Sequence, residues 1–120
     1  SLITIFGCGG NKDRLKRPVM GKYATELSDF TIITSDNPRF EEPFEIIEEI
    51  KKGISEEAEY KVIENREEAI KAGIGMSVTG DIILICGKGH ETYQEIKGVR
   101  SHFDDKETVL KYQNLSLKNA

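Results

Sequence analysis

The sequence predicts an α/β fold: a Rossmann-like three-layer sandwich with a mostly parallel sheet and a C-terminal β-hairpin. Two observations lead to this prediction. Short apolar runs rich in β-branched residues alternate with segments whose apolar residues recur at helical spacing. Helices placed between buried strands are typical of βαβ units, in which consecutive strands are parallel. We expect all 120 residues to form a single domain.

Apolar runs at residues 2–6, 30–34, 60–63 and 81–86 are the expected strands of the parallel sheet. The run at 81–86, Asp-Ile-Ile-Leu-Ile-Cys, gives the clearest prediction of a buried strand. Two later runs, at 94–96 and 99–103, flank Lys97-Gly98 and predict a β-hairpin.

Helices are expected after the first, second and third strands and after the hairpin. Pro18 and Pro43 each stand where a first helical residue tolerates proline. Asn65 and Asp104 each precede a glutamate by three positions, as N-capping residues do. The side chains expected on the buried faces of the first two helices are Met20, Tyr23, Ala24 and Leu27, and Phe44, Ile47, Ile50 and Ile54.

Composition narrows the class of protein. The net charge is −4, which argues against nucleic acid as a partner, because duplex binding normally needs a basic face. No apolar run approaches the roughly 20 residues that span a bilayer, so no membrane partner is expected. The two cysteines, Cys8 and Cys86, and the lack of a basic leader favour a reducing, cytoplasmic location. Because the sequence starts at Ser1 rather than Met, we expect it to be cut from a longer chain.

Three loops that follow expected strands hold the unusual polar residues: residues 7–17, 35–42 and 87–92. In open parallel sheets, ligands bind outside the carboxyl ends of the strands. These ends meet at one edge of the sheet, so we expect the three loops to form a binding site there.

The first loop is glycine-rich and basic. Glycines between a strand and a helix allow backbone N–H groups to approach an anion. The loop lacks the Lys-Ser/Thr ending of a P-loop and is not a G-x-G-x-x-G fingerprint. Composition alone therefore leaves anion binding and a plain turn equally open.

The second loop contains a carboxylate, an amide and a guanidinium in Asp36-Asn37-Pro38-Arg39. This set suits a zwitterion, with Arg39 taking a carboxylate and Asp36 an ammonium. An Asx-type turn whose arginine faces solvent is the alternative. In the third loop Glu91 could hold an ammonium, whereas His90 as a base would need an orienting partner that sequence cannot identify.

Taken together, the three loops resemble one family. The matching segments, in order, are Gly7-Cys8-Gly9-Gly10 with Lys16-Arg17-Pro18-x-Met20, then Ser35-Asp36-Asn37-Pro38-Arg39-x-Glu41-Glu42-Pro43, then Gly87-Lys88-Gly89-His90-Glu91. This pattern resembles the C-terminal domain of Mur ligases of the MurE type, from near residue 3 to about residue 112. The resemblance implies an ATP-dependent amide ligase of cytoplasmic peptidoglycan synthesis, which adds meso-diaminopimelate to UDP-N-acetylmuramoyl-L-Ala-D-Glu.

The resemblance also implies roles for particular residues. Arg39 would grip the distal carboxylate of the diamino acid, which lysine lacks, with Asn37 and Asp36 assisting. The Gly87 carbonyl and Glu91 would hold the distal ammonium. Lys12 stands where the family usually has an arginine, in Gly10-Asn11-Lys12-Asp13 instead of Gly-Asp-Arg-Asp. Lysine keeps the charge but loses the planar fork, so a close analogue such as lanthionine remains open. No residue is expected to be catalytic or to bind a metal.

By the same resemblance, the chain is a C-terminal domain truncated at its N-terminal side, without the central ATP-binding domain. ATP and Mg²⁺ would bind the full-length enzyme and not this fragment, which we expect to be inactive alone. Its partners would be the diamino acid, the UDP-linked dipeptide and the missing central and N-terminal domains. The alternatives are a murein-tripeptide recycling ligase, a lysine-adding ligase, and a non-catalytic Rossmann-like module that binds an anion or nucleotide.

Overall fold

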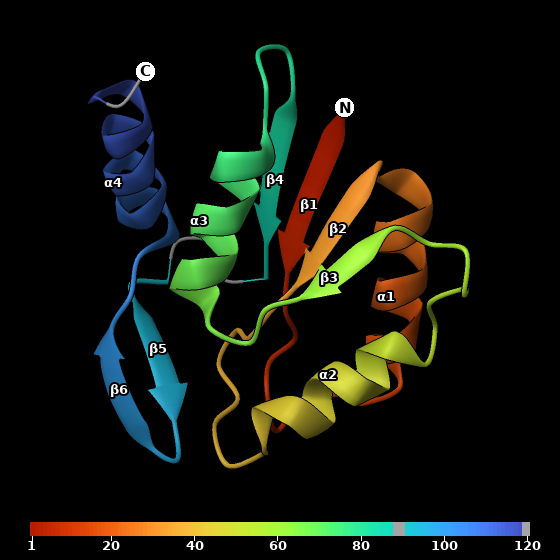
Figure 1. Ribbon diagram of the computed structural model, residues 1–120. Helices are drawn as coiled ribbons and strands as arrows, with labels where there is room; N and C mark the ends of the chain where they lie inside the picture. The colour runs from red at the N-terminus through yellow and green to blue at the C-terminus, as the bar shows by residue number, and fades with distance from the viewer. Residues whose placement is uncertain (88–90, 119–120) are drawn as a thin grey trace.

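The computed structural model describes residues 1–87 and 91–118, the last three of them as backbone only. Over these residues the chain has the predicted order of strands and helices (Figure 1). The elements are β1 (Leu2–Phe6), α1 (Lys16–Leu27), β2 (Phe30–Ile33), α2 (Pro43–Lys51), β3 (Tyr60–Val62), α3 (Arg66–Met76), β4 (Ile82–Cys86), β5 (Tyr93–Ile96), β6 (Val99–His102) and α4 (Asp105–Lys118). The predicted caps of α3 and α4 are confirmed: the side chain of Asn65 accepts from Glu68 N, and that of Asp104 from Lys106 N.

The main sheet is parallel throughout, with the strand order β3-β2-β1-β4. In its central strand, Ile5 pairs with Ile32 on one side and with Ile85 on the other. Strands β5 and β6 form a separate antiparallel hairpin, which turns at Lys97 and Gly98. Both turn residues have positive φ (52° and 79°), as a two-residue hairpin turn matching the twist of its strands requires.

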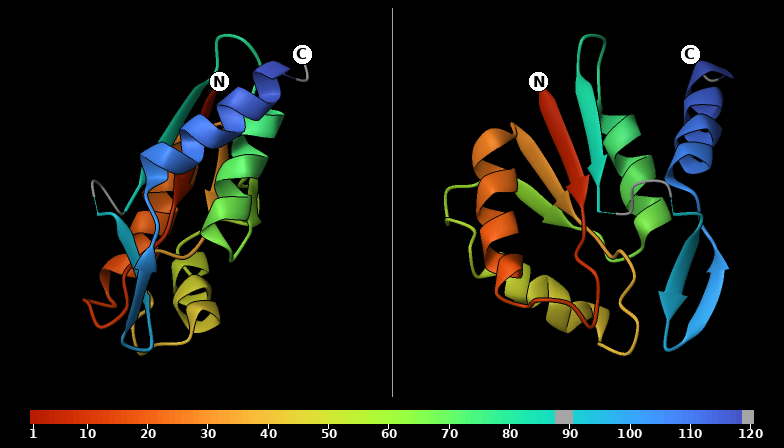
Figure 2. Two further views of the ribbon diagram at one scale, coloured as in Figure 1. Left: turned by 90° about the vertical axis from the view of Figure 1, so that its left-hand side faces the viewer. Right: turned by 180° about the vertical axis from the view of Figure 1, so that it is seen from behind.

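Helices cover both faces of the sheet, as a three-layer sandwich requires (Figures 1 and 2). Because neighbouring residues of a strand point to opposite faces, β1 supplies Ile5 to one core and Phe6 to the other. Phe6 packs in a cluster with Ile47 and Ile50 of α2, whereas Ile5 packs with Ala69 of α3. Helix α1 packs on α2, and α4 packs on α3.

Strand β4 corrects the sequence prediction. Its apolar run gave the clearest prediction of a buried strand, but the strand lies at the edge of the sheet, where Ile82 is 65% and Leu84 47% exposed. The alternate residues Ile83 and Ile85 pack against the α3 core. The described chain places no helix over Ile82 and Leu84, so an unbroken apolar run produced a strand covered on one face.

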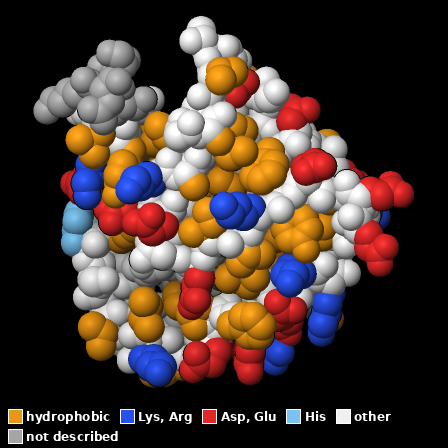
Figure 3. Space-filling model, in the orientation of Figure 1, with side chains coloured by type: hydrophobic (Ala, Val, Ile, Leu, Met, Phe, Trp, Pro, Cys, Tyr) orange, Lys and Arg blue, Asp and Glu red, His pale blue; other side chains and the backbone are white. Residues whose placement is uncertain are grey.

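Two helices also bury other residues than expected. In α1, Met20, Tyr23 and Leu27 are largely exposed, and the buried residues are Arg17 and Gly21. Gly21 explains the difference, because a Cβ at this position would lie 2.3 Å from the carbonyl oxygen of Ile50 in α2. Close contact between the two helix backbones turns the larger side chains outward. In α2, Ile47 and Ile50 are buried as expected, together with Ile46, but Phe44 is exposed. Figure 3 shows apolar side chains among charged ones on the surface.

The fully buried Arg66 ties the carboxyl ends of two strands to α4. Its guanidinium donates to both carboxylate oxygens of Asp105, at 2.8 and 2.7 Å. It also donates to the carbonyl oxygen of Ser35, after β2, and to that of Cys86, which ends β4. Arg66 therefore sets where the second and third loops leave the sheet.

Replacing Arg66 by Met should destabilise the chain by about 3–5 kcal/mol. The substitution leaves the buried Asp105 carboxylate and two backbone carbonyl groups without their hydrogen-bond donor. Urea unfolding followed by circular dichroism measures the effect. The matched control is Lys111→Met, which removes an exposed ion pair with Glu67 and should cost about 1 kcal/mol or less. Equal losses in the two variants would contradict the role assigned to Arg66.

Candidate functional site

The three predicted loops converge on one pocket of about 250 Å³ beyond the carboxyl ends of β1, β2 and β4. Its lining residues are Gly7, Cys8, Gly9, Lys12, Asp13, Lys16, Arg17, Met20, Asp36, Arg39, Gly87 and Glu91. Of the six residues proposed from sequence, all but Asn37 are among them. Residues 88–90 of the third loop, including His90, lie outside the described part of the chain.

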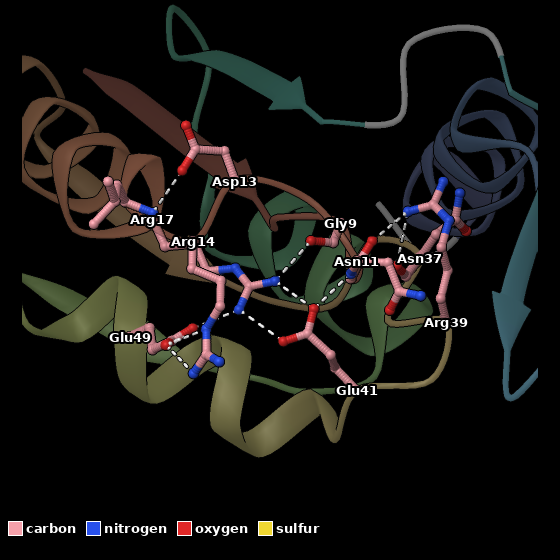
Figure 4. Close-up of polar contacts among 11 residues, drawn as sticks. Gly9, Asn11, Asp13, Arg14, Arg17, Asn37, Arg39, Glu41 and Glu49 are labelled. Carbon is pink, nitrogen blue, oxygen red and sulfur yellow. Dashed lines mark hydrogen bonds and ion pairs between the residues drawn. The ribbon is translucent and has the colours of Figure 1, made fainter.

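Arg39 is held by backbone groups. Its Nη1 donates to the carbonyl oxygens of Gly10, at 3.0 Å, and Asn37, at 3.3 Å (Figure 4). Its own backbone pairs with the hairpin: Arg39 N donates to Glu95 O, and Lys97 N donates to Arg39 O. These bonds hold Arg39 at a φ of 54°, a left-handed conformation that is unusual for a residue with a Cβ. Over the described residues, no carboxylate pairs with the Arg39 guanidinium, so its charge is not neutralised.

Arg17 differs from Arg39 because two carboxylates, those of Glu41 and Glu49, neutralise its charge. It is 1% exposed and donates to both carboxylate oxygens of Glu41, to the carboxylate of Glu49 and to Gly9 O. Glu41 also accepts from the backbone N–H of Asn11. The hydrogen bonds from Arg17 lower the pKa of Glu41 from 4.5 to about 2. Arg17 thus joins the first loop, the second loop and α2 (Figure 4).

Asn37, although not a lining residue, connects the second loop to its surroundings. It is fully buried, and its side-chain oxygen accepts from Glu95 N of the hairpin. Its backbone oxygen accepts from Gly10 N, at 2.7 Å. The following Pro38 disfavours helical geometry at Asn37. The side chain of Asn37 therefore orders the loop that carries Asp36 and Arg39.

Two carboxylates bring negative charge to the pocket. Glu91 accepts a hydrogen bond of 2.9 Å from the Tyr93 hydroxyl, and this bond raises the pKa of Tyr93. Asp36 is 7% exposed, and its backbone oxygen accepts from Gln94 Nε2 of the hairpin. The hairpin therefore supports both residues.

A glycine and a thiol complete the pocket. Gly87 has a φ of 109° and lies against Gly7, so close that a Cβ would be 2.8 Å from Gly7 O. A larger residue would be strained there and would collide with the first loop. Cys8 lies at hydrogen-bonding distance from the Met20 sulfur, and burial raises the pKa of its thiol to about 11. Cys8 is thus a neutral lining group at physiological pH.

Two cations with no carboxylate partner among the described residues share the pocket with the buried Asp36 and the half-buried Glu91. This combination suits a ligand that carries both charges. Arg39 and Lys12 can receive a carboxylate, and Asp36 and Glu91 can receive an ammonium. The described residues contain no group of three or more His, Cys, Asp or Glu placed to hold a metal ion. They also contain no helix long and apolar enough to cross a membrane.

Sequence reasoning missed the residues that organise the pocket. Arg17 and Glu41 stand in the motifs that carried the family resemblance, but nothing in the sequence shows that they pair or that Arg17 is buried. Tyr93 stands next to the predicted hairpin, but nothing in the sequence indicates that its hydroxyl bonds to Glu91. These contacts depend on the packing of α1 against α2 and on the position of the hairpin.

The fold agrees with what comparison with known proteins shows. Residues 1–89 match the family model described as "Mur ligase, glutamate ligase domain", and the chain belongs to this family. Within it, the chain is 56% identical over 106 residues to the UDP-N-acetylmuramoyl-L-alanyl-D-glutamate--2,6-diaminopimelate ligase of Fusobacterium nucleatum, covering 88% of this chain and 22% of that protein. The ligase of the same name from Aquifex aeolicus is 56% identical over 108 residues, covering 90% and 22%.

A solved structure gives the same result. The structure titled as a UDP-N-acetylmuramoyl-L-alanyl-D-glutamate--2,6-diaminopimelate ligase superimposes with a TM-score of 0.92 at 44% identity, over 97% of this chain and 24% of that one. The Bacteroides thetaiotaomicron ligase of this name is 53% identical over 94% of this chain and 24% of its own length. The chain therefore spans about a quarter of the proteins it matches. The predicted fold is confirmed.

The lowered pKa of Glu41 predicts a pH-dependent contribution to stability. A carboxyl group whose folded-state pKa lies below its unfolded value stabilises the fold above about pH 4.5, and loses this effect as the pH falls toward 2. Glu41→Gln should therefore lower the free energy of unfolding at neutral pH by about 1.5–3 kcal/mol. The difference from wild type should shrink steadily on acidification through that range.

Urea unfolding at several pH values measures this difference. The control is Glu56→Gln, which removes an exposed carboxylate outside the Arg17 contacts and should change little at any pH. A Glu41→Gln difference that stays constant down to about pH 2 would contradict a charge-assisted bond to Arg17.

Proposed function

We propose that the chain is the amino-acid-binding C-terminal domain of a cytoplasmic Mur ligase. This ligase adds meso-diaminopimelate, or a close analogue, to UDP-N-acetylmuramoyl-L-Ala-D-Glu in peptidoglycan synthesis. One observation carries the proposal: Arg39 lines the pocket, and its guanidinium is held by two backbone carbonyl groups with no carboxylate partner among the described residues. The names of the related ligases support the same substrate.

In this proposal the pocket recognises the distal end of the diamino acid. The distal carboxylate binds Arg39, with Lys12 adding a second positive charge. The distal ammonium binds Glu91, Asp36 and the carbonyl of Gly87. Asn37 assists by holding the second loop in place, since its side chain is bonded to Glu95 N. The two charges of the ligand thereby match the two kinds of charge that line the pocket.

The same charges select against lysine. Lysine keeps the distal ammonium but has a hydrogen where diaminopimelate has its distal carboxylate. Binding lysine would remove Arg39 from water without giving it a counter-charge, and sites that hydrogen-bond a missing group reject the analogue strongly. This argues against the lysine-adding alternative. The non-catalytic anion-binding alternative does not account for the carboxylates of Asp36 and Glu91 among the residues that line the pocket.

The role of this chain in the reaction is to bind and orient the incoming amino acid. In an ATP-dependent ligase of this kind, the amino group attacks an acyl phosphate formed from ATP on the glutamate carboxylate, and phosphate leaves. Held orientation of the reacting groups accounts for much of such a rate. We place ATP, Mg²⁺ and the UDP-linked dipeptide mainly on other domains, because the related ligases are about four times as long as this chain.

Arg39→Ala, in a full-length ligase carrying this chain, should lower kcat/KM for meso-diaminopimelate by about 10²–10³-fold, the cost of a lost charged pair in a closed site. The low turnover of L-lysine should change much less, because lysine makes no use of Arg39. Phosphate release from ATP measures both. Arg39→Lys keeps the charge and should recover only part of the loss. Equal losses for both amino acids would contradict the assignment.

Lys12→Arg tests the departure from the family pattern. An arginine can bind a carboxylate with two parallel hydrogen bonds, so the variant should raise the preference for diaminopimelate over lysine by about 2–10-fold. Competition assays with meso-diaminopimelate, lanthionine and L-lysine measure the ratios. Lys16→Arg, which alters a neighbouring lining lysine, is the matched control. An unchanged ratio in Lys12→Arg would show that Lys12 does not reach the distal carboxylate.

A further inference from the structure

We propose that Arg17 is a positioning residue for the carboxylate-binding arginine, Arg39, and thereby determines the selectivity of the pocket between diamino acids. This inference rests on the function proposed above. Arg17 has no assigned role in that function. Although it lines the pocket, its side chain is 1% exposed and its guanidinium is engaged by Gly9, Glu41 and Glu49 rather than by a ligand. Its effect is therefore exerted through other residues.

A series of bonds leads from Arg17 to Arg39 across the first and second loops (Figure 4). Arg17 Nη2 donates to Gly9 O at 3.0 Å and to Glu41 at 2.7 Å, so one guanidinium grips both loops. On the other side of Gly9, Gly10 donates from its N–H to the second loop and accepts from Arg39 Nη1 at 3.0 Å. The carbonyl that orients Arg39 thus belongs to the residue beside the one that Arg17 holds.

Gly9 and Gly10 are packed too tightly against their neighbours to accommodate a side chain. A Cβ on Gly9 would lie 2.9 Å from Arg39 Nη1, and one on Gly10 would lie 1.8 Å from Pro38 O. The first loop is therefore in direct contact with the Arg39 guanidinium and with the backbone just before it. A displacement of Gly9 or Gly10 would therefore move the Arg39 guanidinium or distort its bond to the carbonyl oxygen of Gly10.

Glu41 also holds the first loop, through the backbone N–H of Asn11. While one of its oxygens receives Arg17 Nη2, that oxygen also accepts from Asn11 N. Asn11 has a φ of 57°, and the next residue is Lys12, the second cation of the pocket. Arg17 and Glu41 together therefore set the backbone on both sides of Gly10, and with it both carboxylate-binding side chains.

A purely structural role and a positioning role predict different losses. If Arg17 only stabilises the fold, its loss affects all amino acids alike. If it positions Arg39, its loss affects diaminopimelate, which uses Arg39, far more than lysine, which does not. The ratio of kcat/KM for the two amino acids separates these roles, and a stability measurement alone does not.

The experiment uses a full-length ligase carrying this chain, with Arg17→Lys and Glu41→Gln as conservative variants. Arg14→Ala is the matched control: Arg14 bonds the same Glu49 as Arg17, but from an exposed position outside the pocket lining. Kinetics with meso-diaminopimelate and L-lysine are measured by phosphate release, with KM for ATP and for the dipeptide substrate recorded in parallel. Urea unfolding reports the stability of each variant.

We expect Arg17→Lys and Glu41→Gln to lower the diaminopimelate-to-lysine ratio by about 10–100-fold, mainly through KM for diaminopimelate, because small displacements of binding groups have effects of this size. KM for ATP should stay within about twofold, and Arg14→Ala should keep the wild-type ratio. An unchanged ratio in folded Arg17→Lys and Glu41→Gln would overturn the inference. A wild-type enzyme without preference for diaminopimelate would instead overturn the proposed function, so the two failures are distinguishable.

Discussion

The bonds that the buried Arg17 makes to Gly9, Glu41 and Glu49 are the interactions on which the pocket depends. Burying a guanidinium is unfavourable unless charge and geometry compensate for the lost hydration. Here two carboxylates and a backbone carbonyl do so, and each belongs to a different part of the chain. One side chain thereby fixes the first loop, the second loop and α2 relative to one another. Arg66 does the same for the second loop, the end of β4 and the start of α4.

This arrangement distinguishes the arginines that organise the loops from Arg39, which we propose binds a ligand. Arg17 and Arg66 are almost fully buried and face carboxylates, whereas the Arg39 guanidinium, among the described residues, bonds to carbonyl oxygens alone. Carbonyl groups orient a guanidinium but leave its net charge in place. A preorganised, uncompensated cation in a shaped pocket is the feature that lets a protein recognise one particular carboxylate.

Much of the fold followed from local sequence. Apolar runs, helical spacing, Pro43 at the start of α2 and the caps at Asn65 and Asp104 identified the elements, and the meeting of strand ends at one edge predicted that the three loops line one pocket. Pro18 was expected at the first position of its helix, but α1 begins two residues earlier, at Lys16. The errors came from packing between elements. Strand β4 has the pattern of a buried strand, yet it lies at the edge of the sheet, and Gly21 brings α1 too close to α2 for the larger residues of α1 to lie between them. Likewise, the burial of Arg17 depends on partners 24 and 32 residues away, which no local pattern reveals.

The central claim is that Arg39 receives the distal carboxylate while Arg17 keeps its own partners. A crystal structure of a full-length ligase carrying this chain, bound to meso-diaminopimelate, tests it most directly. The account predicts the distal carboxylate at about 2.8 Å from the Arg39 guanidinium, with Arg17 still bonded to Glu41 and Glu49. A distal carboxylate bound elsewhere, or an ammonium group facing Arg39, would contradict it.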